Sequence, residues 1–213
     1  MKASTSLTSI VGAALALSLT PAMAETKTYD ITGFDQLDIS TGIYVEARVG
    51  KDFSIRAEGS QEAIDRLRIE LDDDSLEIGR ERGAFFGRKN SKVTIYIEMP
   101  SLEEAEISSG SSLFADGIDA SDFEVSVSSG ARAELRGHCS DLEADGSSGA
   151  KLDAEKLRCD SVEADVSSGA NLNVYASRSV SADASSGGNV TVYGNPTQTN
   201  IEKSSGGNVS IRD

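Results

Sequence analysis

The tripeptide Ser-Ser-Gly recurs through the second half of this chain at nearly constant spacing. Its glycines are separated by 20, 19, 20, 18 and 19 residues. The copies end at Gly110, Gly130, Gly149, Gly169, Gly187 and Gly206. A fixed period of this length indicates a repeat architecture, in which each repeat is one structural unit. This repeat constrains the fold of the 213-residue chain more than any other feature.

Apolar and polar residues alternate on both sides of each glycine. After the glycine, positions +1, +3 and +5 hold a small residue and then two aliphatic ones, as in segment 150–154. Before it, positions −7, −5 and −3 are apolar, as in segment 162–166. A period of two is typical of β-strands, and glycine suits a bend where a Cβ is costly. Each repeat is therefore predicted to contain two short strands.

One repeat cannot bury its apolar side chains alone, but stacked repeats can, because equivalent columns then lie about 4.8 Å apart in one core. Small and β-branched residues in a narrow coil predict an all-β fold, a single-chain parallel β-helix (β-solenoid) with rungs of about 19 residues. Segment 37–47 fits the template and is the expected first rung. A leucine-rich repeat would need several leucines and an asparagine per unit, and the regular columns disfavour a disordered Ser/Gly linker.

The N-terminus has the features of a secretory signal peptide: Lys2, an apolar run over 10–19, and Ala22-Met23-Ala24. We expect cleavage after Ala24, which leaves one β-helix domain over residues 25–213. The apolar run is too short to span a bilayer, and no cysteine lies near the cleavage site for lipid attachment. These features predict a periplasmic or secreted protein that does not span a membrane.

The chain is acidic, with a formal net charge of −15 at pH 7, which disfavours binding to nucleic acid or an anionic membrane. Outward positions −6 and −4 of successive repeats would form an acidic ladder of like charges about 5 Å apart. Its residues are Glu104, Glu106, Glu124, Glu143, Asp145, Glu163, Asp165 and Asp183. Such a ladder could bind calcium or a basic partner. The alternative is a solvated, salt-screened face that keeps strands from aggregating. Alternating carboxylates make no preformed cage, so we predict neither a metal site nor a cofactor.

Cys139 and Cys159 each lie ten residues before the next repeat glycine, so they share a column in neighbouring rungs. Stacking would place their Cα atoms about 5 Å apart, within disulfide range. Export would supply an oxidising compartment. We therefore predict a disulfide, with two buried free thiols as the alternative.

The segment between the first rung and the repeats is less regular. A strand is expected at 53–57, a helical turn at 61–67 capped by Ser60, and a further strand at 93–97. The loop at 79–92 holds the only basic and aromatic cluster of the chain, which could contact a partner or a membrane surface. Its candidate contact residues are Arg80, Arg82, Phe85, Phe86, Arg88 and Lys89. The alternative is a hairpin loop whose phenylalanines cover the core.

The layout from Phe34 to Asp213 resembles the head GIN domain family, called putative autotransporter adhesins. The resemblance rests on Leu37-Asp38-Ile39 with Gly42-Ile43-Tyr44, on the strand at 93–102, and on the Ser-Gly rungs that follow. It implies an exported single-chain β-helix, with no catalytic residues to transfer to this chain.

The leading functional prediction is an exported, non-enzymatic, adhesin-like module that binds a protein or glycan at the cell envelope. One alternative is a carbohydrate-active β-helix enzyme, which would need long loops around a cleft, and rungs of 18 to 20 residues leave little room for them. Another alternative is a partner in envelope assembly or sensing. The sequence points to no catalytic residue.

The last repeat offers an edge of its own. Segment 206–213 carries Val209 and Ile211 on a strand with unpaired backbone groups. We expect this C-terminal edge to pair with a second copy or another partner. The alternative is a monomer with a frayed last rung.

Overall fold

The computed structural model describes residues 24–81 and 92–212. The N-terminal part of the chain contains β1 (Glu25–Tyr29), β2 (Gln36–Ile39), β3 (Tyr44–Val49), β4 (Ser54–Gly59), α1 (Gln61–Ile64), β5 (Leu67–Asp72), β6 (Ser75–Arg80), β7 (Val93–Met99) and β8 (Glu104–Ile107). The repeats contain β9 (Ser112–Val127), β10 (Arg132–Gly146), β11 (Lys151–Val166), β12 (Asn171–Ala184), β13 (Asn189–Tyr193), β14 (Gln198–Lys203) and β15 (Asn208–Arg212).

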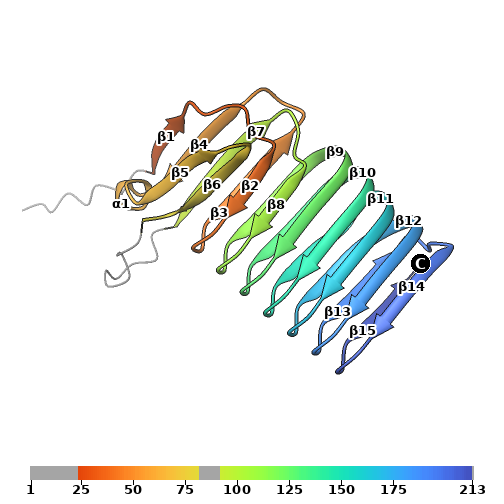
Figure 1. Ribbon diagram of the computed structural model, residues 1–213. Coiled ribbons are helices and arrows are strands. Elements are labelled where there is room, and N and C mark those ends of the chain that lie inside the picture. Colours follow the sequence, from red (N-terminus) through yellow and green to blue (C-terminus); the bar gives the residue numbers. More distant parts are fainter. Residues whose placement is uncertain (1–23, 82–91, 213) are drawn as a thin grey trace, which may run out of the picture.

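The repeats stack as a parallel β-solenoid, as the period predicted (Figure 1). Strands β9 to β12 each run from one side of the coil around a corner to the other side. Each pairs in parallel with the equivalent strand of the next rung, as β9–β10, β10–β11 and β11–β12. Irregularities in register, such as the one between Leu135 and Gly137, absorb the variation in repeat length. We call the side that continues β2, β8 and β14 the β2 face, and the side that continues β3, β13 and β15 the β3 face.

The Ser-Ser-Gly bends form a row along one edge of the solenoid (Figure 1). In each bend the second serine and the glycine both have positive φ, as at Ser129 (φ 51°) and Gly130 (φ 72°). The N–H of Ala131 donates to the carbonyl of Ser128 at 3.0 Å, which closes a turn with the φ signs of type I′. The Gly130 N–H donates to Ser148 of the next bend at 3.1 Å, so the bends also bond to one another.

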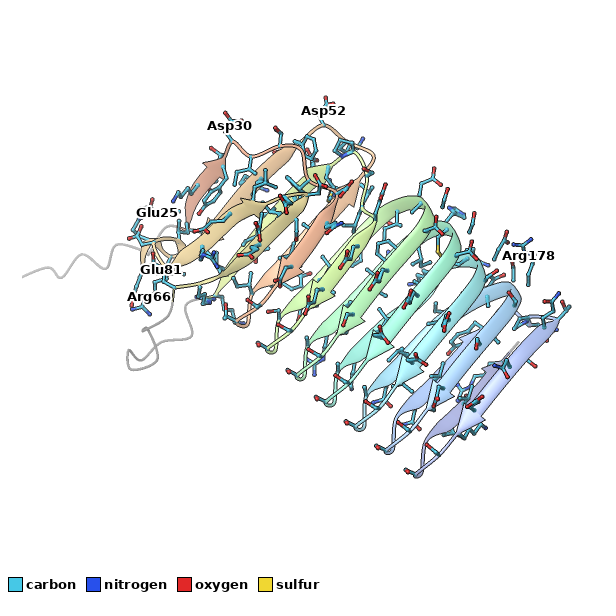
Figure 2. The ribbon with its side chains drawn as sticks, in the orientation of Figure 1. Glu25, Asp30, Asp52, Arg66, Glu81 and Arg178 are labelled. Atoms are coloured by element: carbon cyan, nitrogen blue, oxygen red, sulfur yellow. A yellow bond between two sulfur atoms is a disulfide. The ribbon has the colours of Figure 1, made fainter. Side chains whose placement is uncertain are left out.

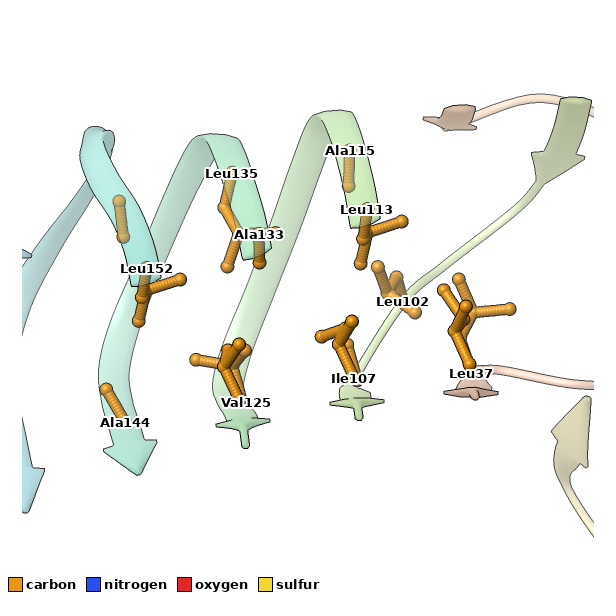
Figure 3. Close-up of a cluster of buried hydrophobic side chains, with 14 of the residues drawn as sticks. Leu37, Leu102, Ile107, Leu113, Ala115, Val125, Ala133, Leu135, Ala144 and Leu152 are labelled. Atoms are coloured by element: carbon orange, nitrogen blue, oxygen red, sulfur yellow. The ribbon is translucent and has the colours of Figure 1, made fainter. Parts of the chain in front are cut away.

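The core is a narrow double layer of small and aliphatic side chains. Leu113 and Ala115 of the β3 face point toward Ile107 and Val125 of the β2 face (Figure 3), and all four are almost fully buried. Alanine recurs in the core columns because two sheets this close leave little space between them. Ser111 is the buried polar exception, and its Oγ accepts from the Gly42 N–H at 3.1 Å and more weakly from Ile43.

The first rung lies where the sequence placed it, with β2 beside β8 and β3 beside β9. The segment between β3 and β8 adds one strand to each side of the first rung, because β6 pairs in parallel with β2 and β7 pairs in parallel with β3. Beyond these strands the pairing is antiparallel, in the pairs β5–β6, β4–β7 and β1–β4. The helical turn is shorter than expected and ends at Ile64, although Ser60 caps it by accepting from the Ala63 N–H at 3.3 Å. This segment lacks the repeat columns, so its pairing depends on long-range contacts.

The predicted disulfide is present between Cys139 and Cys159. The two residues are direct partners in the parallel register of β10 and β11, with their Cα atoms 4.5 Å apart. The bridge therefore joins neighbouring rungs at the corner where each strand passes from the β3 face to the β2 face.

Candidate binding surface

The acidic ladder occupies the outer surface of the β2 face as two parallel rows. Parallel register fixes the rows, because each residue lies beside its equivalent in the next rung (Figure 2). The first row is Gln36, Glu104, Glu124, Glu143, Glu163, Ser181 and Asn200. The second row is Glu77, Asp38, Glu106, Ser126, Asp145, Asp165, Asp183 and Glu202. We call these the acidic rows, and none of their members is a lysine or an arginine.

Two acidic residues of the second row, Asp38 and Glu77, were missing from the predicted ladder. Asp38 lies at an outward position between the buried Leu37 and Ile39 of the first rung, so the repeat template could have identified it. Glu202 follows by the same template in the last rung, beside Asp183. Glu77 could not be found in this way, because it comes from the antiparallel hairpin β5–β6, which adds to the edge of β2. The second row therefore reaches from β6 to β14, and its carboxylate at the β6 end, Glu77, is paired with Arg68 at 3.0 Å.

Partial burial and crowding of like charges raise the pKa values of three carboxylates in the acidic rows. Partial burial, followed by repulsion from Asp165 and Glu143, raises the pKa of Asp145. Partial burial and repulsion from Glu124 and then Glu106 raise the pKa of Glu104. The pKa of Asp38 is raised by burial and by the carboxylates of Glu106 and Glu77. Each shift means that burial, and then the neighbouring charges, disfavour the ionised form in the folded protein.

A shallow groove of ≈ 700 Å³ crosses the β2 face along the first acidic row. Glu104, Glu124, Glu143 and Glu163 line it together with serine, glutamine and asparagine side chains. Its lining contains no arginine, lysine or histidine. A second hollow of ≈ 480 Å³ lies beside Asp145, Asp165 and Asp183, next to serines of the bends. Both hollows are open to solvent and follow rows of carboxylate and hydroxyl oxygens. Neither is closed enough to surround a small molecule.

The described residues form no group of three or more histidine, cysteine or acidic side chains arranged to hold a metal ion. Carboxylates one strand apart point outward in parallel and do not converge on a common point. The acidic rows therefore supply a diffuse negative potential, which attracts cationic groups without a fixed coordination geometry.

The β3 face has a different chemistry. Arginines lie over aromatic rings there, with Arg136 4.9 Å from the Phe114 ring centroid and Arg158 4.6 Å from that of Tyr175. Arg48 stands in register with Asp116, so charges of both signs are neighbours. Charges of both signs are mixed on this face, whereas the acidic rows of the β2 face carry one sign. These cation–π pairs could not be predicted from local sequence, because each joins residues of neighbouring strands that are far apart in the chain.

The predicted basic loop falls largely outside the described residues, which exclude Arg82, Phe85, Phe86, Arg88 and Lys89. Arg80 is the last residue of β6 and is partly buried. Burial, and then the charge of Arg66, lower the pKa of its guanidinium. The predicted signal peptide also lies outside the described residues except for Ala24. Within residues 24–81 and 92–212 no helix is long and apolar enough to cross a membrane.

Comparison with known proteins supports the resemblance seen in the sequence. Residues 33–196 match the family described as "Putative auto-transporter adhesin, head GIN domain", which is more than half of the chain. The chain belongs to this family. No curated protein gives a significant match to the sequence of this head GIN domain.

Solved structures share the fold of this head GIN domain. A putative adhesin from Bacteroides fragilis is 16% identical with a TM-score of 0.68, and the alignment covers 89% of this chain and 97% of that one. A putative lipid binding protein from Parabacteroides distasonis is 14% identical with a TM-score of 0.52, and the alignment again covers 89% of this chain and 97% of that one. A putative adhesin from Parabacteroides merdae is 13% identical, with 89% and 96% covered and a TM-score of 0.52. At these identities the likeness concerns the fold alone.

Proposed function

We propose that this head GIN domain is an exported, non-enzymatic binding module of the adhesin type, and that it engages a partner at the cell envelope through the acidic rows. The concentration of one charge sign along a single face carries this proposal. A protein or glycan with cationic groups would meet several rungs at once, which favours rapid and oriented association. Family membership, the signal-like N-terminus and the disulfide support a role outside the cytoplasm.

The alternative of a carbohydrate-active enzyme has one observation in its favour, which is the groove with Glu124 and Glu143 in its lining. A hydrolase of this kind needs one carboxyl held protonated and another placed across the scissile bond. The groove carboxylates instead point outward side by side, and no long loop closes over them in the described repeats. A polysaccharide lyase would instead need arginine or lysine side chains to stabilise the negative charge that develops on the sugar, and the groove lining has none.

Binding to isolated envelopes tests the proposal. Residues 25–213, purified with the disulfide intact and labelled, should bind saturably to envelope fractions, and binding should weaken as salt screens the acidic rows. Replacing Glu124, Glu143 and Glu163 by glutamine should reduce binding at least tenfold. The matched control replaces Glu46, Glu98 and Glu134 of the β3 face by glutamine and should leave binding unchanged. Recovery of bound proteins and glycans from the pull-down would identify the partner and separate an adhesin from an assembly or sensing component.

Two results would contradict the proposal. Equal loss of binding in the two triple variants would show that net charge, and not the acidic rows, determines the interaction. Release of new reducing ends from envelope polysaccharides, abolished by Glu124→Gln or Glu143→Gln, would show instead that the groove is an active site.

A further inference from the structure

The C-terminal end of the solenoid exposes the edge of the stack. Among the described strands, β14 pairs only with β12, and β15 pairs only with β13. Ile201 on β14 and Ile211 on β15 continue the buried columns but are 36% and 40% exposed. Both strands keep the parallel register of the inner rungs. This end therefore presents the same kind of surface that each inner rung offers to the next rung.

Lys203 interrupts the core column at this end. It is the partner of Ala184 in the register of β12 and β14, and the same column holds Ile107, Val127 and Val166 in earlier rungs. A lysine thus stands where the inner rungs, except the one with Gly146, carry an aliphatic side chain. Its Nζ donates to the carbonyl of Val209 on β15 at 2.8 Å. The side chain therefore reaches from one terminal strand to the other across the end of the core.

The carbonyl that Lys203 contacts belongs to the open edge. Successive residues of a parallel strand direct their backbone groups to opposite sides. The N–H of Asn208 donates toward β13, to the carbonyl of Gly188 at 2.9 Å, so the backbone groups of Val209 point away from the stack. Lys203 consequently occupies an acceptor that an added strand would need. An inward-pointing charge on a terminal strand is a known way to block edge-to-edge pairing.

The other end of the molecule has a different surface. There the outermost strands β1 and β5 run antiparallel to their neighbours, and α1 packs beside β4 (Figure 1). The C-terminal end of one copy therefore does not match the N-terminal end of another as a continued parallel rung. Two C-terminal ends can instead meet about a two-fold axis, and such an arrangement is closed after two copies.

The sequence suggested that this edge pairs in the wild-type protein, but the contact between Lys203 and Val209 argues against it. We propose that the C-terminal end is a latent pairing surface for the same end of a second copy, and that Lys203 holds it closed. Two-fold pairing would bring two Lys203 ammonium groups into one interface, where neither has a carboxylate partner in the last core column. It would also require each Nζ to leave Val209. With the lysine removed, Ile201, Ile211 and the free backbone groups would favour association.

Removal of the charge tests the proposal directly. Lys203→Met keeps the unbranched apolar stem and removes the ammonium group. Sedimentation equilibrium and light scattering should give the mass of one copy for the wild-type chain and, at high micromolar concentration, the mass of two for Lys203→Met. Larger assemblies should not form, because the two-fold contact is closed. If Lys203→Met fails to fold, Lys203→Val replaces it, since valine occupies this column at Val127 and Val166.

Two controls separate edge pairing from a general increase in apolar surface. Lys151→Met removes an exposed lysine from the β3 face, away from the end, and should remain a monomer. Lys203→Met combined with Ile211→Lys returns a charge to the edge and should restore the monomer. A wild-type dimer, a folded Lys203 variant that stays monomeric, or a Lys151→Met dimer would each overturn the proposal.

Discussion

Neutralising a single carboxylate in the acidic rows should make the protein more stable. Asp145 is the best position for this test, because it stands in register with Asp165, and its pKa is raised by burial and then by several acidic neighbours. Like charges in adjacent strands lie about 5 Å apart, and their repulsion is about 0.8 kcal/mol in water and about 3 kcal/mol at the dielectric of a protein surface. Because Asp165 is exposed and Asp145 is only half-buried, the repulsion should lie near the lower end of this range.

We therefore expect Asp145→Asn to raise the free energy of unfolding by about 1 kcal/mol at low ionic strength. For a chain of this size, that corresponds to an increase in Tm of about 2–4 °C. Urea unfolding followed by circular dichroism measures the change. In 1 M salt the Debye length falls to about 3 Å, so the difference from the wild-type protein should largely disappear.

Asp116→Asn on the β3 face is the matched control. Asp116 stands in register with Arg48, so its removal deletes an attraction and should cost between about 0 and 1 kcal/mol. A loss of stability in Asp145→Asn, or a gain that is equal at low and high salt, would refute the argument that repulsion in the acidic rows opposes folding.

The remaining predictions concern pH, calcium, the disulfide and the bends. The pKa values of Asp38, Glu104 and Asp145 are raised in the folded state, so the folded protein takes up protons at these groups more readily than the unfolded chain. Their contribution to stability should therefore increase as pH falls from neutral through the raised values, and level off below 3.8 for aspartate and 4.5 for glutamate. Urea midpoints at pH 7 and pH 5 should show this increase, and Asp145→Asn should reduce it. Millimolar calcium should raise Tm no more than sodium chloride of equal ionic strength, and a larger calcium effect would reveal a specific site. Denatured, non-reduced protein should contain no titratable thiol, and Cys139→Ser with Cys159→Ser should lower stability by about 3 kcal/mol, measured by urea unfolding. Gly130→Ala should cost only about 1 kcal/mol, for positive φ in open space. Gly137→Ala should cost clearly more in the same assay, because its Cβ would overlap the carbonyl oxygen of Ile118.

The repeated part of the fold could be predicted from the sequence because each rung is its own template. Once the glycines were aligned, the columns gave the parallel register, the disulfide and most of the acidic rows. The bends show the limit of this reasoning, since the second serine, such as Ser129, adopts positive φ together with the glycine. Serine has a Cβ and rarely adopts positive φ, so its presence in the bend did not indicate a left-handed conformation.

The N-terminal part could be predicted only as separate strands. The sequence indicated β4 and β7, but not that β7 lies between β4 and β3 with one antiparallel and one parallel neighbour. Such pairings join residues far apart in the chain, and local alternation carries no information about them. The same limit hid Glu77, which joins the acidic rows only because β6 pairs with β2.

The acidic rows connect stability with binding. The core columns stabilise each rung through apolar burial, whereas the carboxylates on its outer surface repel those of the next rung. A partner that brings cationic groups to the β2 face would supply the attraction that the protein lacks there and would lower the pKa values of the acidic rows. A partner that binds only the folded chain must also raise its free energy of unfolding, and the increase grows with the affinity for the ionised rows. The partner should therefore raise the Tm of the wild-type protein more than that of the variant with Glu124, Glu143 and Glu163 replaced by glutamine. Because binding lowers the pKa values of these carboxyl groups, it should also release protons from them. A ligand that stabilised both proteins equally would have to bind elsewhere on the solenoid.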